Sequence, residues 1–108
     1  MPAGKKYPEM RKSQSKCVLN DGLLMHGGVI PSKTRPLNDF YYLSNDLHWL
    51  KIFVLEGPKA RCCHQMAAVG NTVYLVGGYS KPVQNLKSKS EIEKIMMNDM
   101  WKFDFENA

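Results

Sequence analysis

The chain contains the same arrangement of residues twice, fifty positions apart. In each copy an arginine lies three residues after a proline, and a pair of glycines begins sixteen residues after the arginine. The equivalent positions are Pro8 and Pro58, Arg11 and Arg61, Gly27 and Gly77, and Gly28 and Gly78. An internal period of this length indicates a structural unit that stacks on its own copies, because one unit cannot bury its apolar face alone. We therefore expect two copies of one supersecondary unit.

Each unit predicts a β-hairpin that ends at its glycine pair. In the second unit, residues 72–76 are rich in β-branched and aromatic side chains and follow a Gly70-Asn71 turn, with a short apolar run over 62–69 before it. In the first unit, residues 15–19 and 23–26 flank the turn Asn20-Asp21-Gly22. Turn residues that tolerate positive φ between two strand-like runs are typical of hairpins.

A loop after each glycine pair leads to an Asn-Asp step and an aromatic strand. Asn38-Asp39 opens this strand in the first unit and Asn98-Asp99 in the second. Such side chains favour a turn at a strand entry. The first unit continues into a fourth strand over residues 47–54, whereas the sequence stops before the equivalent strand of the second unit.

The loop over residues 79–97 is ten residues longer than its counterpart in the first unit. It contains the capping spacing S-x-x-E twice, at Ser88 with Glu91 and at Ser90 with Glu93. Residues 90–97 are compatible with a short helix and with an irregular loop, and the sequence leaves both open.

The order of these parts resembles the kelch repeat, over nearly the whole chain from Pro8 onward. That repeat consists of Pro-x-x-Arg, two strands ending at Gly-Gly, a loop, an Asn-Asp step with an aromatic strand, and a tryptophan in a final strand. The residues at its motif positions are Gly27, Gly28, Asn38, Asp39, Trp49, His64, Gly77, Gly78, Asn98, Asp99 and Trp101.

The resemblance implies an all-β fold of two consecutive four-stranded antiparallel kelch blades, the second incomplete, as part of a β-propeller. It divides the chain into a basic N-terminal arm (1–7), a degenerate first repeat (8–57) and a second repeat (58–108) without an outer strand and with the long loop 79–97. Gln14 stands at the position of His64, and Leu24 at that of Tyr74. We therefore expect the first strand of the first unit to pair loosely and residues 1–16 to fray.

Two blades are too few for a closed ring, since propellers typically contain about four to eight. We expect the chain to be a fragment, a short isoform or a truncated product of a larger kelch protein, with closure by homo-oligomerisation as the alternative. We also expect the isolated chain to be marginally stable and to self-associate through unpaired strand edges.

The net charge is +5, and residues 1–16 alone carry +4. We interpret this segment as solubilising, because apart from Tyr7 no aromatic residue lies between its charges to stack on nucleic-acid bases. No apolar run approaches the roughly 20 residues of a membrane-spanning helix. We expect a cytoplasmic location, with the nucleus as an alternative, and neither a membrane nor a nucleic acid as partner.

The sequence predicts no cofactor, no metal and no catalytic residue. Cys17, Cys62 and Cys63 lack the spacing of a disulfide framework or a zinc site, and we expect them to be reduced. The three histidines His26, His48 and His64 show no spacing suited to a shared metal. We expect His64 to have a structural role at the start of its strand.

The resemblance implies a non-catalytic protein–protein interaction module that presents blade loops to a protein partner, for example as a substrate adaptor or scaffold. By position, the candidate partner-binding residues are Arg11, Val29, Arg35, Arg61, Tyr79 and Lys81. Their basic character favours a partner with an acidic segment. Remaining kelch blades or a second copy of the chain are further expected partners. The alternative is a fragment of a kelch-fold enzyme of the copper oxidase, mutarotase or specifier type.

Overall fold

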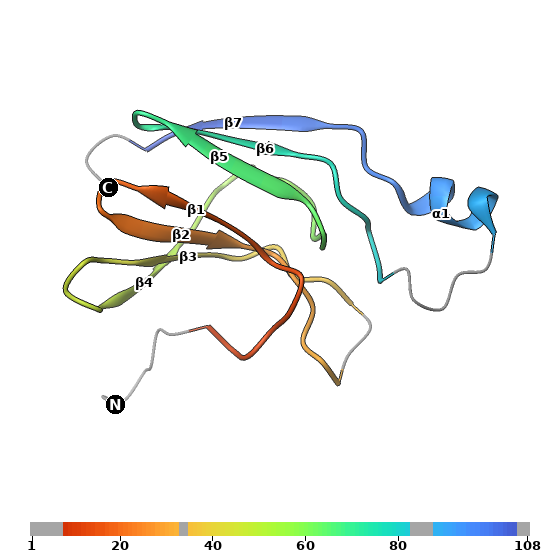
Figure 1. Ribbon diagram of the computed structural model, residues 1–108, viewed down its shortest axis with the longest axis horizontal. Coiled ribbons are helices and arrows are strands. Elements are labelled where there is room, and N and C mark those ends of the chain that lie inside the picture. Colours follow the sequence, from red (N-terminus) through yellow and green to blue (C-terminus); the bar gives the residue numbers. More distant parts are fainter. Residues whose placement is uncertain (1–7, 33–34, 83–87, 106–108) are drawn as a thin grey trace.

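The computed structural model describes residues 8–32, 35–82 and 88–105, and they form two antiparallel sheets stacked face to face (Figure 1). The first sheet has the order β1-β2-β3-β4 and the second has the order β5-β6-β7. The strands of the first sheet are β1 (Ser15–Leu19), β2 (Gly22–His26), β3 (Phe40–Leu43) and β4 (Trp49–Ile52). Those of the second are β5 (Gln65–Val69), β6 (Thr72–Val76) and β7 (Met100–Asp104). The predicted all-β fold of two antiparallel blades is confirmed.

The two sheets use the same register at the fifty-residue offset. Cys17 lies opposite Leu24 in the first hairpin, and Ala67 lies opposite Tyr74 in the second. The turns differ in type, however. Asn20 and Asp21 have φ values of 49° and 65°, as a type I′ turn requires, whereas Gly70 with φ 63° opens the equivalent turn.

The first strand of the first unit is fully paired. All five residues of β1 pair with β2, from Ser15 opposite His26 to Leu19 opposite Gly22. The expectation of a loosely paired first strand was therefore wrong. Leu19 is buried, so apolar packing fixes the strand even without a histidine at position 14. Residues 1–7, the predicted basic arm, lie outside the described part of the chain.

The core lies between the two sheets. Residues of β2 and β3, led by Leu24 and Phe40, pack against Val73 and Leu75 of β6. Side chains alternate between the faces of a strand, so β5 contributes only Met66 and Ala68 to this contact. The facing sheets thus bury one apolar face of each unit. Stacking thus buries the apolar face that a single unit would leave exposed to water.

The long loop contains a helix, α1 (Lys89–Ile95). Its N-cap is Ser88, whose side-chain oxygen accepts a hydrogen bond from the backbone N–H of Glu91 at 3.2 Å. Of the two capping spacings in the sequence, the structure uses the first. The buried Ile95 anchors the helix, which at seven residues depends on such packing. No helix in the described ranges is both long and apolar enough to cross a membrane.

Candidate functional site

A buried arginine connects three parts of the second unit. The Arg61 side chain is fully buried, and its Nη1 and Nη2 atoms donate to the two carboxylate oxygens of Asp99, both at 2.7 Å. Nη1 also donates to the Gly77 carbonyl at 3.0 Å, and Nε donates to the Lys59 carbonyl at 3.1 Å. Arg61 therefore joins the entry of the unit, its glycine pair and its Asn-Asp step.

The first unit repeats each of these contacts. Arg11 donates through Nη1 and Nη2 to the carboxylate of Asp39, the second bond at 3.2 Å. It also donates to the Gly27 carbonyl at 3.1 Å and to the Glu9 carbonyl at 3.2 Å. Because both copies have the same geometry, these arginines have a structural role at this end of each blade. We call these two arrangements the Arg–Asp clamps.

The clamp of the second unit keeps the Asp99 carboxylate ionised. Hydrogen bonds from the Arg61 guanidinium hold the pKa of Asp99 well below its usual range, against the opposing effect of burial. The Trp101 indole Nε1–H, which donates to Asp99 Oδ2 at 2.7 Å, adds to this lowering of the pKa. A carboxylate so engaged remains an anion at neutral pH and is poorly suited to proton transfer. In both units the aspartate of the Asn-Asp step forms an ion pair with the arginine of the same unit.

Two buried histidines meet between the sheets. His26 Nδ1 lies 2.9 Å from His64 Nε2, and both side chains are buried. The other ring nitrogens, His26 Nε2 and His64 Nδ1, have no hydrogen-bond partner. Burial, followed by the positive charges of His64 and Arg61, lowers the pKa of His26 to about 3. Burial, followed by the charge of Arg61, lowers the pKa of His64 to about 4. Both rings are therefore neutral at physiological pH.

Backbone hydrogen bonds join the units at the same place. Gly28 N donates to the Arg61 carbonyl at 3.0 Å, and Cys63 N donates to the Ser13 carbonyl at 2.9 Å. Ser13 and Cys63 occupy equivalent positions, and both have φ 59°. The glycine pair, the clamp and the histidine pair thus form one connected end of the molecule.

The structure separates the predicted partner-binding residues into two groups. Arg61 and Val29 are buried, and the Arg11 side chain is only 2% exposed, so these three offer little surface to a partner. Arg35 and Lys81 are exposed, and Tyr79 is half-buried, with its backbone bridged to Cys62 and Met96. The binding role of all six residues stays a prediction. The geometry favours the exposed members.

A pocket opens at the loop end of the second unit. It has a volume of about 360 Å³ and lies between the loop before Arg61, the helix α1 and the start of β7. Two lysines, Lys59 and Lys94, contribute to its lining, together with the apolar Ile95 and the aromatic Trp101. Asp99 also lines the pocket, and its carboxylate forms an ion pair with Arg61. Such a pocket can accept an apolar group flanked by negative charge. We call it the loop pocket.

Most of the motif residues identified from the sequence contribute to the backbone conformation or to packing. Gly27, Gly28, Gly77 and Gly78 all have positive φ, between 68° and 95°. Asn38 and Asn98 are exposed beside the clamps. Trp49 is half-buried on β4, with its ring centroid 6.3 Å from that of Tyr41. Trp101 on β7 occupies the position in the second unit that Tyr41 on β3 occupies in the first.

Sequence reasoning did not identify the partner of His64. The available signal was His26 itself, a polar residue on a strand position where the second unit has Val76. Across the described ranges, no three or more histidine, cysteine, aspartate or glutamate side chains gather to hold a metal ion. Cys17, Cys62 and Cys63 are free thiols, and burial raises the pKa of Cys62 to about 11.

Two stacked antiparallel sheets of equal register, each with an Arg–Asp clamp at its glycine pair, define a protein built from blade-like β repeats. The family described as Kelch motif matches residues 60–94, within the second unit. The chain is also similar to Kelch-like protein 24 from Rattus norvegicus, Homo sapiens and Mus musculus, at 36% identity over 76 residues in each case. The match covers 68% of this chain and 12% of each relative's length. The chain is a kelch-repeat protein.

Proposed function

We propose that this chain is a non-catalytic protein-interaction module, which presents the loops of its blades to a protein partner as an adaptor or scaffold. The observation that carries the proposal is the duplicated Arg–Asp clamp. It uses Arg11 and Arg61 to hold the two ends of each loop together, since each arginine bonds to the glycine pair before the loop and to the aspartate after it. Fixed loops lose little conformational freedom on binding, which favours recognition of a partner surface.

The charge of the exposed loop residues supports an acidic partner segment. Arg35 and Lys81 are exposed after the glycine pairs, and Lys59 and Lys94 line the loop pocket. The net charge of +5 adds a long-range attraction for an acidic surface. We propose further kelch blades, or a second copy of the chain, as additional partners, and the cytoplasm or nucleus as the location.

A fragment of a kelch-fold enzyme is the second candidate, and the site favours it less. Asp39 and Asp99 are held in ion pairs, and the two buried histidines contact each other. These are the titratable groups that a hydrolase or lyase would use as acid or base. Because the aspartates pair with arginines and the histidines with each other, these groups stabilise the fold.

The proposal is tested by comparing captured partners across matched charge variants. The tagged full chain, the double variant Lys81→Glu with Lys94→Glu, and a control with Lys102→Glu and Lys16→Glu are cross-linked in lysate and analysed by mass spectrometry. Both double variants change the net charge equally, and all four lysines are exposed. We expect partners of the wild type to be retained by the control and lost by the loop variant. Identical partners on all three chains would refute loop-mediated binding.

A further inference from the structure

Among the described residues, β4 at the edge of the first sheet pairs only with β3, so its other backbone edge has no partner strand there. Ser44 N donates to the His48 carbonyl at 2.9 Å, so this pair is a hydrogen-bonded one. Because such pairs alternate along an antiparallel ladder, Leu50 and Ile52 bond to β3 while the backbone groups of Trp49 and Lys51 point outward. The edge therefore offers donors and acceptors in the spacing of a strand.

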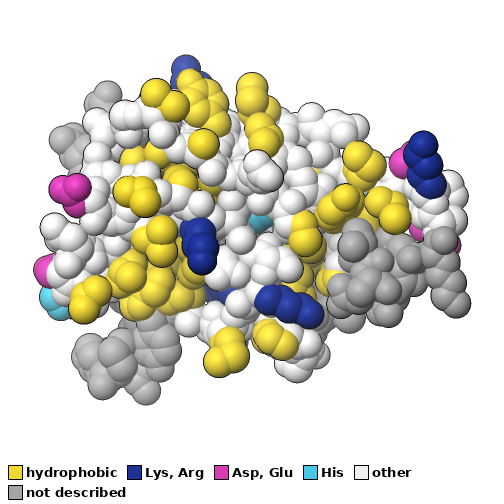
Figure 2. All heavy atoms as spheres, viewed as in Figure 1, with side chains coloured by type: hydrophobic (Ala, Val, Ile, Leu, Met, Phe, Trp, Pro, Cys, Tyr) yellow, Lys and Arg dark blue, Asp and Glu magenta, His cyan; other side chains and the backbone are white. Residues whose placement is uncertain are grey.

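Exposed apolar side chains follow this edge. Four apolar residues within a stretch of nine are exposed. Their accessible surface, relative to that of the free residue, is 76% for Leu47, 55% for Leu50, 83% for Phe53 and 105% for Leu55. Figure 2 shows hydrophobic side chains gathered over the first sheet, next to the turn that leads into β4. An exposed apolar patch beside an unpaired strand edge marks an interaction site.

Lys51 gives this edge a charge preference. Its Nζ lies 5.8 Å from the ring centroid of Tyr41 and 5.5 Å from that of Phe53. No carboxylate of the described residues lies within ion-pair distance of it. The aromatic rings hold the ammonium group in place without neutralising it. An acidic side chain on a neighbouring strand would form an ion pair with Lys51.

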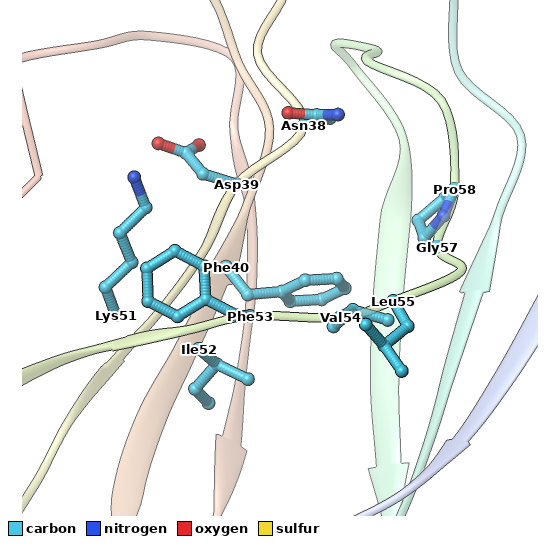
Figure 3. Close-up of a pocket in the computed structure, with 10 residues that line it drawn as sticks. All are labelled: Asn38, Asp39, Phe40, Lys51, Ile52, Phe53, Val54, Leu55, Gly57 and Pro58. Atoms are coloured by element: carbon cyan, nitrogen blue, oxygen red, sulfur yellow. The ribbon is translucent and has the colours of Figure 1, made fainter.

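A pocket continues the edge where β4 ends. Its volume is about 410 Å³, and Figure 3 shows it between the start of β3 and the segment that leads to the second unit. Phe40 and Phe53 line it from two sides, and Gly57 and Pro58 close its far side (Figure 3). A partner strand that runs antiparallel to β4 would enter past this pocket.

We propose that the β4 edge binds an extended segment of a protein partner as a fifth, antiparallel strand of the first sheet. Residues directly opposite each other share a face, so the segment must match β4 position by position. Opposite Ile52, Lys51, Leu50 and Trp49 it would carry, in its own N-to-C direction, an apolar, an acidic, an apolar and an aromatic residue. Backbone hydrogen bonds would provide affinity and these side chains selectivity.

This site lies beyond the proposed loop function. It uses the outer edge of a blade, and the loop pocket lies in the other unit. The two sites can be tested by different variants, since none of the loop lysines belongs to β4.

The test uses the full chain and a fluorescein-labelled peptide with the core Val-Glu-Val-Phe between Ser-Gly flanks, together with its Val-Lys-Val-Phe counterpart. Fluorescence anisotropy gives the dissociation constants for wild type, Lys51→Glu, Lys51→Gln and the control Lys102→Glu. We expect wild type and control to prefer the glutamate peptide by about fivefold, the size of a good cross-strand pair. Lys51→Glu should reverse this preference, and Lys51→Gln should abolish it.

Amide NMR spectra of the same samples locate the peptide. Shifts and slowed hydrogen exchange at Trp49 and Lys51 would support strand addition. Shifts confined to the loop pocket, or an unchanged preference in Lys51→Glu, would refute it. Sedimentation as a dimer that Leu50→Glu dissociates would also refute it, because the edge would then belong to a second copy. These outcomes leave the loop-variant experiment unaffected.

Discussion

The side chains of His26 and His64 meet across the two sheets, with 2.9 Å between His26 Nδ1 and His64 Nε2. The two residues belong to different repeat units, so each sheet contributes one partner. A neutral pair of this kind shares one proton between the facing nitrogens, and it leaves the outer nitrogens without partners in a buried site. The contact therefore couples the stacking of the sheets to the protonation of the histidines.

We predict that the chain loses stability between about pH 7 and pH 5. Because the pKa values of His26 and His64 are lowered in the folded state, to about 3 and about 4, the unfolded chain binds more protons in this range. Stability is complete above the ordinary histidine pKa of about 6.5 and falls as the pH decreases from there. Each histidine contributes a loss of about 2 kcal/mol between pH 7 and pH 5. Urea unfolding followed by tryptophan fluorescence measures this.

The repeat itself supplies the control variants for that experiment. Val76 stands at the position equivalent to His26, and Gln14 at that equivalent to His64. The double variant His26→Val with His64→Gln should unfold with little dependence on pH from 7 to 5, whereas His48→Gln, with an exposed side chain, should behave as wild type. A double variant with the full pH dependence would assign the effect to other groups.

We predict that Arg61→Ala lowers the free energy of unfolding by about 2–5 kcal/mol, because a fully buried side chain is replaced by a cavity, and this is enough to unfold a marginal domain. The variant removes four side-chain hydrogen bonds, to Lys59, Gly77 and Asp99, and leaves Asp99 without its cation. Arg61→Lys restores the charge but not the bidentate geometry, so it should recover only part of the loss. Chemical unfolding and amide NMR spectra distinguish these outcomes. The exposed neighbour Lys59→Ala is the control, and equal effects of the two alanine variants would contradict a structural clamp.

We predict that Gly27→Ala destabilises the chain more than Gly77→Ala. Both glycines have positive φ, 73° and 68°, so both variants incur the same backbone strain of roughly 1–2 kcal/mol. A Cβ on Gly27 would also lie 2.6 Å from the Arg61 carbonyl and 2.8 Å from His64 Cε1, whereas one on Gly77 would meet nothing closer than 3.8 Å. The additional loss for Gly27→Ala should be about 1–3 kcal/mol. Equal urea midpoints for the two variants would show that the sheets are not in close contact there.

We predict that Ser88→Ala destabilises α1 by about 0.5–2 kcal/mol, while Ser90→Ala has a smaller effect. Only the side chain of Ser88 accepts the hydrogen bond from Glu91 N at the start of the helix. Hydrogen exchange of the amides in α1 measures the difference. Faster exchange in Ser90→Ala than in Ser88→Ala would instead place the helix start two residues later.

Local patterns were sufficient to predict most of the strands. The hairpin turns, the strand runs and the S-x-x-E spacing depend on residues a few positions apart, and the structure contains each of them. The degeneracy inferred from Gln14 and Leu24 misled the prediction for β1. Pairing of that strand depends on burial of Leu19 and Leu24 between the sheets, which the local sequence does not show.

The sequence by itself determined the repeat, the strand order within each unit and the resemblance to the kelch family. These follow from the spacing of glycines, arginines and apolar residues along one chain. Only the tertiary structure decided which charged groups are free for a partner. Arg11 reaches Asp39 over 28 positions and Arg61 reaches Asp99 over 38, and His26 meets His64 only because the sheets stack. Such contacts depend on how each strand is placed in space. The fold thereby buried two of the predicted binding arginines in clamps, and among the described strands it left β4, like β1, β5 and β7, with one unpaired edge.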